Sequence, residues 1–298
     1  MHAITLRYLT EVARRGSVRS AAQTLNVAAS AVNRQILKLE DELGVKLFDR
    51  LPSGMRPTPA GEILLRHVRD TMLGFERSVA EIEGLSGLLS GHVRIVALDS
   101  FLIDFLPECI ATFAERYPAV TFSVSAASSR NVVQQIQDGD ADIGLTFDGP
   151  TSSALRRVAS VLAPIGALMM PDHPLARRTL LSFDDLLPYS SLLFARDNVS
   201  YGTAVDESYT AFRETARARF KSSSIAFSKR MILAGLGIGF FTRIAFHSEL
   251  QDGRLRWIPL DSHRLSQTRV MILAPNNRTL PPAGDLLLRA LEQRLQTV

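Results

Sequence analysis

Between Ser20 and Glu62 the chain reads SAAQTLNVAASAVNRQILKLEDELGVKLFDRLPSGMRPTPAGE. Its apolar residues recur at helical spacing and predict two short helices joined by a tight turn at residues 26–28. With an apolar helix expected over residues 5–15, this arrangement predicts a helix-turn-helix. In such motifs the start of the second helix enters a DNA major groove. The side chains expected there are Ala29, Ser30, Asn33 and Arg34.

A short hairpin is expected next. Two extended segments flank the Pro-Ser-Gly turn at residues 52–54, which is typical of a β-hairpin wing. Arg50 and Arg56 lie on either side of its tip. Basic side chains at that place can reach DNA phosphates or a neighbouring minor groove. We therefore expect both arginines to contact DNA.

A long helix follows the hairpin. Thr58 is expected to cap it, with Pro59 at its first position. Its apolar residues are spaced by alternating steps of three and four, the heptad pattern of a coiled-coil seam. The seam residues are Leu65, Val68, Met72, Phe75, Val79 and Ile82. This pattern favours a homodimer through the helix; the alternative is a helix that packs on its own domain.

Composition and charge limit the class of protein. The chain has 298 residues, of which 46% are hydrophobic, so two or three folded domains are expected. Its formal net charge is +4, and residues 1–60, with nine basic and five acidic side chains, account for all of it. A basic module on a neutral body favours a polyanion such as nucleic acid as the partner of that module, although an excess of this size also arises by chance.

Membrane and secretory segments are not expected. The longest apolar stretch, Ile232 to Phe241, has about ten residues, whereas a membrane span needs about 18–20. The N-terminus lacks the basic and apolar regions of a secretory signal. The single cysteine, Cys109, cannot form an internal disulfide, and an inert thiol is expected in its apolar helix. A cytoplasmic protein with no membrane partner is expected.

Strands and helices alternate from His92 onward. This alternation predicts α/β architecture with parallel sheets and crossover connections. Strands are expected over residues 93–98, 120–125, 143–147, 166–170, 192–195, 238–242 and 269–274. Helices are expected over residues 105–117, 132–137, 204–217, 228–234 and 283–295.

Catalytic and metal motifs are not recognisable in the sequence. It has no phosphate-binding loop and no Gly-x-Ser-x-Gly elbow. The six histidines are scattered, and no pair has metal-ligand spacing. The glycine-rich stretch from Gly235 to Phe240 lies between a helix and a strand, the reverse of the order that a dinucleotide site requires. We therefore expect no enzyme, no catalytic residue, no metal and no cofactor.

The segment from Ser20 to Glu62 resembles the winged helix-turn-helix of LysR-type transcriptional regulators. The likeness rests on Ala21-Ala22, Leu25, Ala31-Val32, Arg34-Gln35-Ile36, Leu39-Glu40, Leu43-Gly44, Leu47-Phe48, Arg50 and Thr58-Pro59-Ala60-Gly61. It extends more weakly over the rest of the chain, where LPECIATFAERYPAVTFSV at 106–124, DGDADIGL at 138–145 and GLGIGF at 235–240 are the best matches.

The resemblance implies a complete architecture: a winged helix-turn-helix with a long linker helix, followed by an α/β domain like a periplasmic binding protein. The parts would be a DNA-binding domain over 1–60, a linker helix and hinge over 61–91, and an effector-binding domain over 92–298. The effector-binding domain would have one subdomain over 92–162 and 267–298 and a second over 163–266. The strand at 269–274, which has no helix before it, would then be the return of the chain to the first sheet.

The same architecture implies a ligand cleft between the subdomains, near the carboxyl ends of the strands. Ser100, Ser128 and Thr146 follow or end the first three strands, so their hydroxyls are expected to converge there, although each could instead cap a turn or a helix. Further cleft residues are expected to be Phe101, Phe147, Asn198, Tyr201 and Thr242. The implied ligand is a small-molecule effector, an anionic metabolite.

Two positions on the second helix of the motif depart from the family's pattern. Ala29 stands where many members have Gln, and Asn33 stands where many have Ser. Ala29 can contact a thymine methyl group, and Asn33 can read adenine with two hydrogen bonds. Leu37 and Ser53 replace commonly basic residues, so fewer phosphate contacts are expected.

The resemblance thus implies a sequence-specific regulator that binds double-stranded DNA as a homodimer through the linker helix and assembles further into a homotetramer. An effector would change subdomain closure and thereby the way the protein sits on DNA. One alternative is an effector-independent regulator with a vestigial cleft. Another is an enzyme or a transport-type binding protein fused to a DNA-binding head, which would need clustered titratable groups in the cleft.

Overall fold

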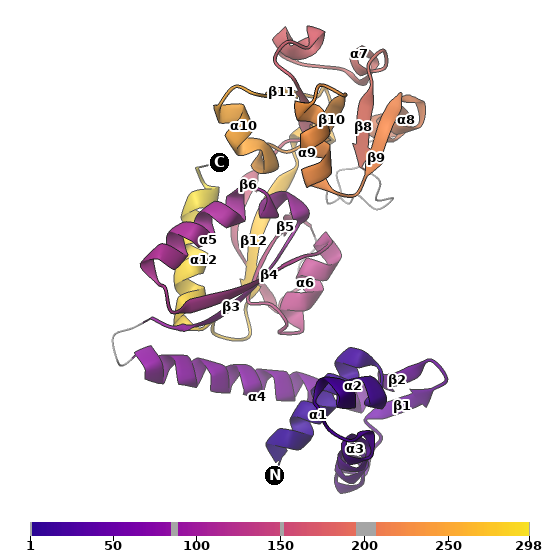
Figure 1. Cartoon of the computed structure of the whole chain (residues 1–298), viewed down its shortest axis with the longest axis vertical. Helices are drawn as coiled ribbons and strands as arrows, with labels where there is room; N and C mark the ends of the chain where they lie inside the picture. Colours follow the sequence, from indigo (N-terminus) through magenta and orange to yellow (C-terminus); the bar gives the residue numbers. More distant parts are fainter. Residues whose placement is uncertain (1, 85–88, 150–151, 195–206, 298) are drawn as a thin grey trace. The chain divides into compact units, whose positions relative to one another are not determined.

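The computed structural model describes residues 2–84, 89–149, 152–194 and 207–297. The chain divides into two compact units, Met1–Val79 and Ala80–Val298, and each is described by itself (Figure 1). The first contains helices and a two-stranded hairpin, and the second contains two five-stranded sheets with their helices. A winged helix-turn-helix, a long helix and an α/β part therefore follow one another, as the sequence predicts.

Three helices form the body of the first unit: α1 (His2–Arg15), α2 (Val18–Thr24) and α3 (Ala29–Leu43). Ser17 caps α2, because its Oγ accepts a hydrogen bond from the backbone N–H of Ser20 at 3.4 Å. Gly44 ends α3 in the left-handed conformation, with φ of 68°. The apolar faces of the helices share one core, which includes Leu9, Val12, Ala21, Ala22, Val32, Ile36 and Leu39.

The wing consists of the antiparallel strands β1 (Phe48–Leu51) and β2 (Gly54–Pro57). The backbone N–H of Met55 donates to the carbonyl oxygen of Gly16 at 2.7 Å. A Cβ atom at Gly54, where φ is 129°, would collide with that oxygen. Glycine at this position therefore lets the wing lie against the body of the unit.

Glu40 joins α3 to the wing. Its side chain is almost fully buried, and its Oε1 accepts hydrogen bonds from the backbone N–H groups of Leu47 at 2.7 Å and Phe48 at 3.2 Å. A buried carboxylate is stable when backbone donors satisfy it in this way. The start of β1 is thus held to the last turns of α3.

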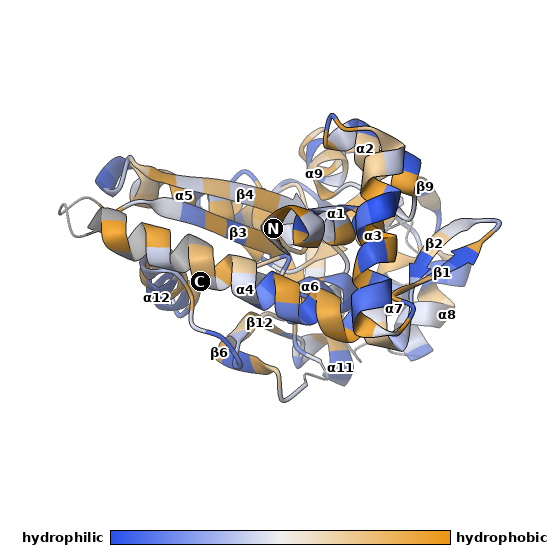
Figure 2. Ribbon diagram, turned by 90° about the horizontal axis from the view of Figure 1, so that it is seen from below, coloured by the Kyte–Doolittle hydropathy of each residue, from blue (hydrophilic) through white to orange (hydrophobic). Residues whose placement is uncertain are grey.

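The long helix α4 (Pro59–Gly84) begins as predicted. Thr58 Oγ1 accepts a hydrogen bond from the backbone N–H of Gly61 at 3.1 Å. Apolar residues recur along the helix (Figure 2). Leu65 and Val68 belong to the core of the first unit. The first turns of α4 are therefore part of the fold of the first unit itself.

The first sheet of the second unit has the strand order β4-β3-β5-β12-β6. Its strands are β3 (Gly91–Ala97), β4 (Val120–Ala126), β5 (Ile143–Phe147), β6 (Leu155–Leu162) and β12 (Arg269–Pro275). β3 is parallel to β4 and β5, whereas β12 is antiparallel to β5 and β6. The helices α5 (Phe105–Arg116) and α12 (Pro282–Leu295) cover one face, and α6 (Ser129–Gln137) covers the other (Figure 1).

The second sheet has the order β11-β7-β10-β8-β9. Its strands are β7 (Gly166–Met169), β8 (Ser191–Phe194), β9 (Ala218–Ser222), β10 (Ile238–Phe241) and β11 (Arg256–Pro259). Its helices are α7 (Phe183–Leu186) and α8 (Glu207–Thr215) on one face and α9 (Ile225–Leu233) and α10 (His247–Gln251) on the other. The short helices of this unit are η1 (Asp99–Leu102), η2 (Pro174–Arg177), η3 (Ile244–Phe246) and α11 (His263–Ser266). Each sheet with its helices forms one subdomain.

The structure corrects the expectation of parallel sheets, because both sheets are mixed. It also contains three strands that the sequence pattern did not predict: β6, β9 and β11. All three lie at sheet edges. Edge strands carry polar and charged side chains, as the residues LRRVASVL of β6 show, so they lack the apolar run of a central strand.

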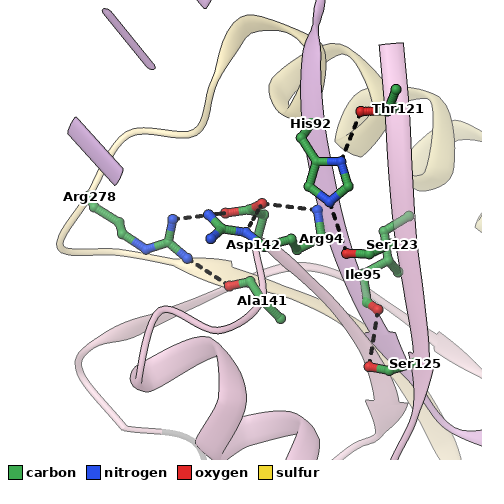
Figure 3. Close-up of polar contacts among 9 residues, drawn as sticks. All are labelled: His92, Arg94, Ile95, Thr121, Ser123, Ser125, Ala141, Asp142 and Arg278. Carbon is green, nitrogen blue, oxygen red and sulfur yellow. Dashed lines mark hydrogen bonds and ion pairs between the residues drawn. The ribbon is translucent and has the colours of Figure 1, made fainter. Parts of the chain in front are cut away.

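A buried carboxylate joins three segments at the amino ends of the parallel strands (Figure 3). Asp142 is wholly buried and accepts hydrogen bonds from the backbone and side chain of Arg94 and from Arg278, whose Nη1 lies 2.9 Å away. Arg278 also donates to the carbonyl oxygen of Ala141 at 2.6 Å. Burial alone would raise the pKa of Asp142, but the hydrogen bonds from Arg94 and Arg278 and the charge of Arg94 outweigh burial and lower the pKa. This cluster is at the opposite ends of the strands from the predicted cleft and is structural.

Candidate nucleic-acid interface and effector cleft

The start of α3 presents the side chains expected to face DNA. Ala29, Ser30 and Arg34 are exposed, and Asn33 is half-buried. The opposite face of the helix is fixed in the core by Val32 and Ile36. Packing therefore sets the orientation of α3, and its polar side chains lie on the face turned away from the core.

The two wing arginines are exposed, and one of them contacts α3. Arg50 lies on β1 and Arg56 on β2. The Nη2 atom of Arg50 donates a hydrogen bond to Oδ1 of Asn33 at 2.7 Å. Arg50 of the wing and Asn33 of α3 thus contact each other, although the sequence predicted each of them as a separate DNA contact.

The long helix exposes part of the predicted heptad seam. Leu65 and Val68 are buried in the unit's own core, so for these two positions the alternative of packing on the same domain is the correct one. The remaining four seam positions are exposed, with Phe75 at 71% and Ile82 at 66% of full exposure; Met72 and Val79 complete them. An apolar stripe of this kind on one helix is open for a partner helix.

Hydroxyl groups lie at the carboxyl ends of the parallel strands, where the cleft was predicted. Ser100 is buried in η1 after β3, and Thr146 is wholly buried near the end of β5. Ser128 caps α6, because its Oγ accepts a hydrogen bond from the backbone N–H of Asn131 at 3.4 Å, which is the alternative role foreseen for it. In the second subdomain Thr242 is buried directly after β10.

The aromatic residues predicted for the cleft have a different placement. Phe101 is wholly buried and packs edge-to-face on Phe105, with ring centroids 5.7 Å apart, so it supports the cleft region from the core and does not line it. Phe147 is also largely buried in this core. Asn198 and Tyr201 lie outside the described residues.

Two buried hydroxyls near the predicted cleft have no hydrogen-bond partner among the residues that the structure describes. They are Thr146 Oγ1 and Ser129 Oγ. Ser129 begins α6, whose first N–H groups form the positive end of the helix dipole. An unsatisfied buried hydroxyl costs about 1–3 kcal/mol, so both groups suit a hydrogen bond to a ligand or a water molecule.

A buried ion-pair cluster joins the two subdomains. Lys229, on α9, lies with its Nζ 3.0 Å from an oxygen of Asp104 and 2.7 Å from Oε2 of Glu249. It also donates to the carbonyl oxygen of Ala245 at 3.1 Å. Because Asp104 directly precedes α5 of the first subdomain, the cluster connects one subdomain to the other. It is named the Lys229 cluster below.

A second contact between the subdomains lies close to Ser100. Asp99 Oδ2 accepts a hydrogen bond from the backbone N–H of Ile225, the first residue of α9, at 3.2 Å. A carboxylate at the start of a helix also favours the helix dipole. The turn η1 of the first subdomain is therefore attached to the helix that carries Lys229.

A cavity of about 500 Å³ opens in the second subdomain, at the amino ends of β8 and β10. His173 and Tyr189 lie in its wall, with ring centroids 4.7 Å apart. Burial lowers the pKa of His173, against the opposing charge of Asp172. The cavity is at the other end of the strands from Thr242 and is separate from the predicted cleft.

The part of the chain that the structure describes holds no cluster of three or more His, Cys, Asp or Glu side chains suited to a metal ion. None of its helices has the length and apolarity that crossing a membrane requires. Cys109 is half-buried, and burial raises the pKa of its thiol to about 11. A thiol with such a pKa is almost entirely protonated near neutral pH and is a poor nucleophile.

The sequence analysis missed two contacts that matter for function: Arg50 with Asn33, and the Lys229 cluster. Their members are separated by 17 and 125 residues. Periodicity reports only neighbours along an element. A buried lysine could have been suspected, since Lys229 stands among apolar residues in the segment from Ile225 to Leu233, but its partners could not.

Two family models match the chain. Residues 5–62 match the bacterial regulatory helix-turn-helix protein model of the lysR family. Residues 86–296 match the LysR substrate binding domain.

Relatives of known role extend over most of the chain. It is 30% identical over 282 residues to the transcriptional dual regulator GltC of Bacillus subtilis, an alignment that covers 94% of this chain and 93% of that protein. It is 28% identical over 241 residues to the transcriptional activator protein LysR of Escherichia coli, with 80% and 77% covered. These relatives are regulators of transcription and not enzymes.

Solved structures share the fold. A full-length OxyR from Pseudomonas aeruginosa, in a variant with one cysteine replaced by aspartate, has a TM-score of 0.66 at 20% identity, covering 96% of this chain and 93% of that one. Full-length CbnR complexed with its target DNA has a TM-score of 0.60 at 18% identity, covering 99% and 100%. At these identities the likeness establishes the architecture and nothing about ligands.

Proposed function

The chain belongs to the LysR family of transcriptional regulators, and on that basis we propose that α3 and the wing bind specific double-stranded DNA sites while the α/β part senses a small molecule. The observation that carries this proposal is the hydrogen bond between Arg50 of the wing and Asn33 of α3, the helix on which Ser30 and Arg34 are exposed. The proposed location is the cytoplasm.

The side chains on this surface divide into two roles. Arg56, and the donors of Arg50 that do not face Asn33, are suited to phosphates, which fix the register of the protein on the duplex. Ser30, Asn33 and Arg34 are suited to base edges in the major groove, with Ala29 close enough to the helix start to touch a thymine methyl group.

The exposed part of the seam supports a homodimer through α4. Met72, Phe75, Val79 and Ile82 would pair with the same residues of a second chain and leave water. Two recognition helices would then reach two half-sites on the DNA. The proposed active form is a homotetramer made of two such dimers.

The proposed effector binds between the subdomains at the carboxyl ends of β3, β4 and β5. Ser100, Ser128 and Thr146 are its contacts on the first subdomain, and Thr242 with Asn198 and Tyr201 are its contacts on the second. The unsatisfied hydroxyls of Thr146 and Ser129, with the positive end of α6, favour an effector with acceptor oxygens, such as an anionic metabolite. The Lys229 cluster would fix the unliganded closure, which the effector then shifts.

The experiment that tests this function is a map of where the purified chain binds fragments of its own genome, at stated salt. The expected result is a small set of sharp sites upstream of genes, whose neighbouring pathways nominate effectors. Uniform binding that falls steeply with salt would contradict specific recognition. Sharp sites whose footprints no nominated metabolite changes would favour the effector-independent regulator with a vestigial cleft.

A further inference from the structure

We infer that Arg50 fixes the amide of Asn33 so that the pair reads a guanine, which makes Asn33 a specificity-determining residue and Arg50 its positioning residue. This inference rests on the DNA-binding function proposed above. It replaces the expectation that Asn33 reads adenine.

The hydrogen bond between the two side chains determines which way the amide faces. A guanidinium group carries only donors, so the atom of Asn33 that it contacts at 2.7 Å must be the amide oxygen. An isolated asparagine can turn its amide to present either oxygen or nitrogen. With its oxygen held by Arg50, Asn33 presents the two hydrogens of Nδ2 instead.

Adenine and guanine differ in what they require from this amide. Adenine offers the N7 acceptor and the N6 amino donor, so an asparagine reads it with its nitrogen and its oxygen together. The oxygen retains a second lone pair, but an amino group that approached it would also approach the positive charge of Arg50. Guanine offers two acceptors, N7 and O6, which suit the two Nδ2 hydrogens that Asn33 presents. The pair therefore favours guanine.

Both side chains project from elements held rigidly together. Asn33 follows Val32, which is wholly buried in the core of the first unit. The backbone N–H of Phe48, two residues before Arg50, donates to buried Glu40 of the same helix α3 at 3.2 Å. The contact between Arg50 and Asn33 is thus made within a fixed frame and is formed before DNA arrives, which lowers the entropy cost of recognition.

Arg56 is a natural control, since it is also an exposed arginine of the wing. It lies on β2, where it stands opposite Asp49 of β1, and not on the strand that contacts α3 through Arg50. A phosphate contact from Arg56 would raise affinity for every sequence equally.

The test is selection of bound duplexes from a randomised pool by the full-length chain, followed by titration of duplexes that differ at one selected position. The proteins compared are the wild type, N33A, R50A, R56A and the double variant N33A/R50A, with circular dichroism to show that each is folded. We expect the wild type to select guanine at one position of each half-site. N33A and R50A should each reduce the preference for guanine at that position about tenfold or more, and the double variant should lose no more than either single one.

The control and the contradicting outcomes are distinct. R56A should weaken binding to all duplexes by the same factor and keep the guanine preference. Selection of adenine at the position lost in N33A, or a uniform loss of affinity in R50A with the base preference intact, would overturn the role assigned to the pair while leaving specific DNA binding in place. A wild type with no base preference at any position would overturn the proposed function as well.

Discussion

Replacement of Lys229 by Met tests whether the Lys229 cluster holds the two subdomains together. Methionine has a similar length and no charge, so the change removes the ion pairs with Asp104 and Glu249 and leaves the packing nearly unchanged. Lys229 is only 9% exposed, so its partners lose a buried counter-charge. In K229M, Glu249 still has a cationic partner, Arg254, at 3.6 Å. Among the described residues, Asp104 has no cationic partner other than Lys229.

The size of the effect follows from this geometry. Removal of one partner of a buried ion pair costs about 3–5 kcal/mol. The lower end, about 3 kcal/mol, applies here because Arg254 compensates one carboxylate. For a unit the size of Ala80–Val298, each kcal/mol lowers Tm by about 2–4 °C. We therefore expect K229M to lower the Tm of the second unit by about 6–12 °C.

Tryptophan fluorescence during thermal unfolding is a suitable assay, because the chain has a single tryptophan, Trp257, and it lies in the second unit. K221M is the matched control, since Lys221 is an exposed lysine on β9 of the same subdomain, and its Tm should stay within about 1–2 °C of the wild type. The double variant D104N/K229M should recover part of the loss, because the unpaired charge is removed. A Tm for K229M equal to that of K221M would refute the argument.

Three further outcomes are expected. D142N should lower the Tm of the second unit at pH 7, because Arg94 lowers the pKa of Asp142 and the ionised carboxylate stabilises the fold above the unfolded carboxyl pKa of about 4. The difference in Tm from the wild type should shrink as the pH falls below about 4. Differential scanning calorimetry in a pH series measures this difference. F75E should lower the mass of the assembly in light scattering, because it breaks the pairing through α4, whereas I63E, an equally exposed change off the seam, should leave the mass unchanged. Cys109, with a thiol pKa of about 11, should react with a thiol reagent at pH 8 about a hundredfold more slowly than the unfolded chain, and equal rates would contradict its burial.

The DNA-binding part was predictable because its signals are local. The Pro-Ser-Gly turn of the wing and the cap at Thr58 each act within a few residues, and the structure contains both. The spacing of the heptad seam was predicted correctly, but the sequence did not show what the seam packs against. Spacing cannot tell whether an apolar stripe packs on its own domain or on another chain, and here Leu65 does the former while Phe75 is exposed.

The α/β part shows where local pattern ends. Central strands such as β5 are buried throughout and were predicted, whereas the edge strands β6, β9 and β11 were not, because their exposed positions carry polar residues. The cleft residues could be predicted only from their positions at the ends of strands. Such a position shows where a residue lies but not which groups it contacts. Ser128 illustrates this, since the same position that suits a ligand also caps α6.

The turn η1 places the proposed effector site next to the contacts that join the subdomains. Asp99 holds the start of α9, Ser100 is the proposed effector contact, and Asp104 holds Lys229. An effector that displaces Ser100 would therefore act on the closure directly, without a long chain of intermediate residues. A free-energy difference of about 1.4 kcal/mol between two closures changes the ratio of their populations tenfold. This difference is less than half of the about 3 kcal/mol expected for the ion pairs of Lys229. By linkage, DNA that favours one closure must change effector affinity by the same factor. An effector that favours the same closure as DNA therefore strengthens DNA binding, and an effector that favours the other closure weakens it. K229M removes the ion pairs that join the subdomains. It should reduce both the effect of the effector on DNA binding and the effect of DNA on effector affinity.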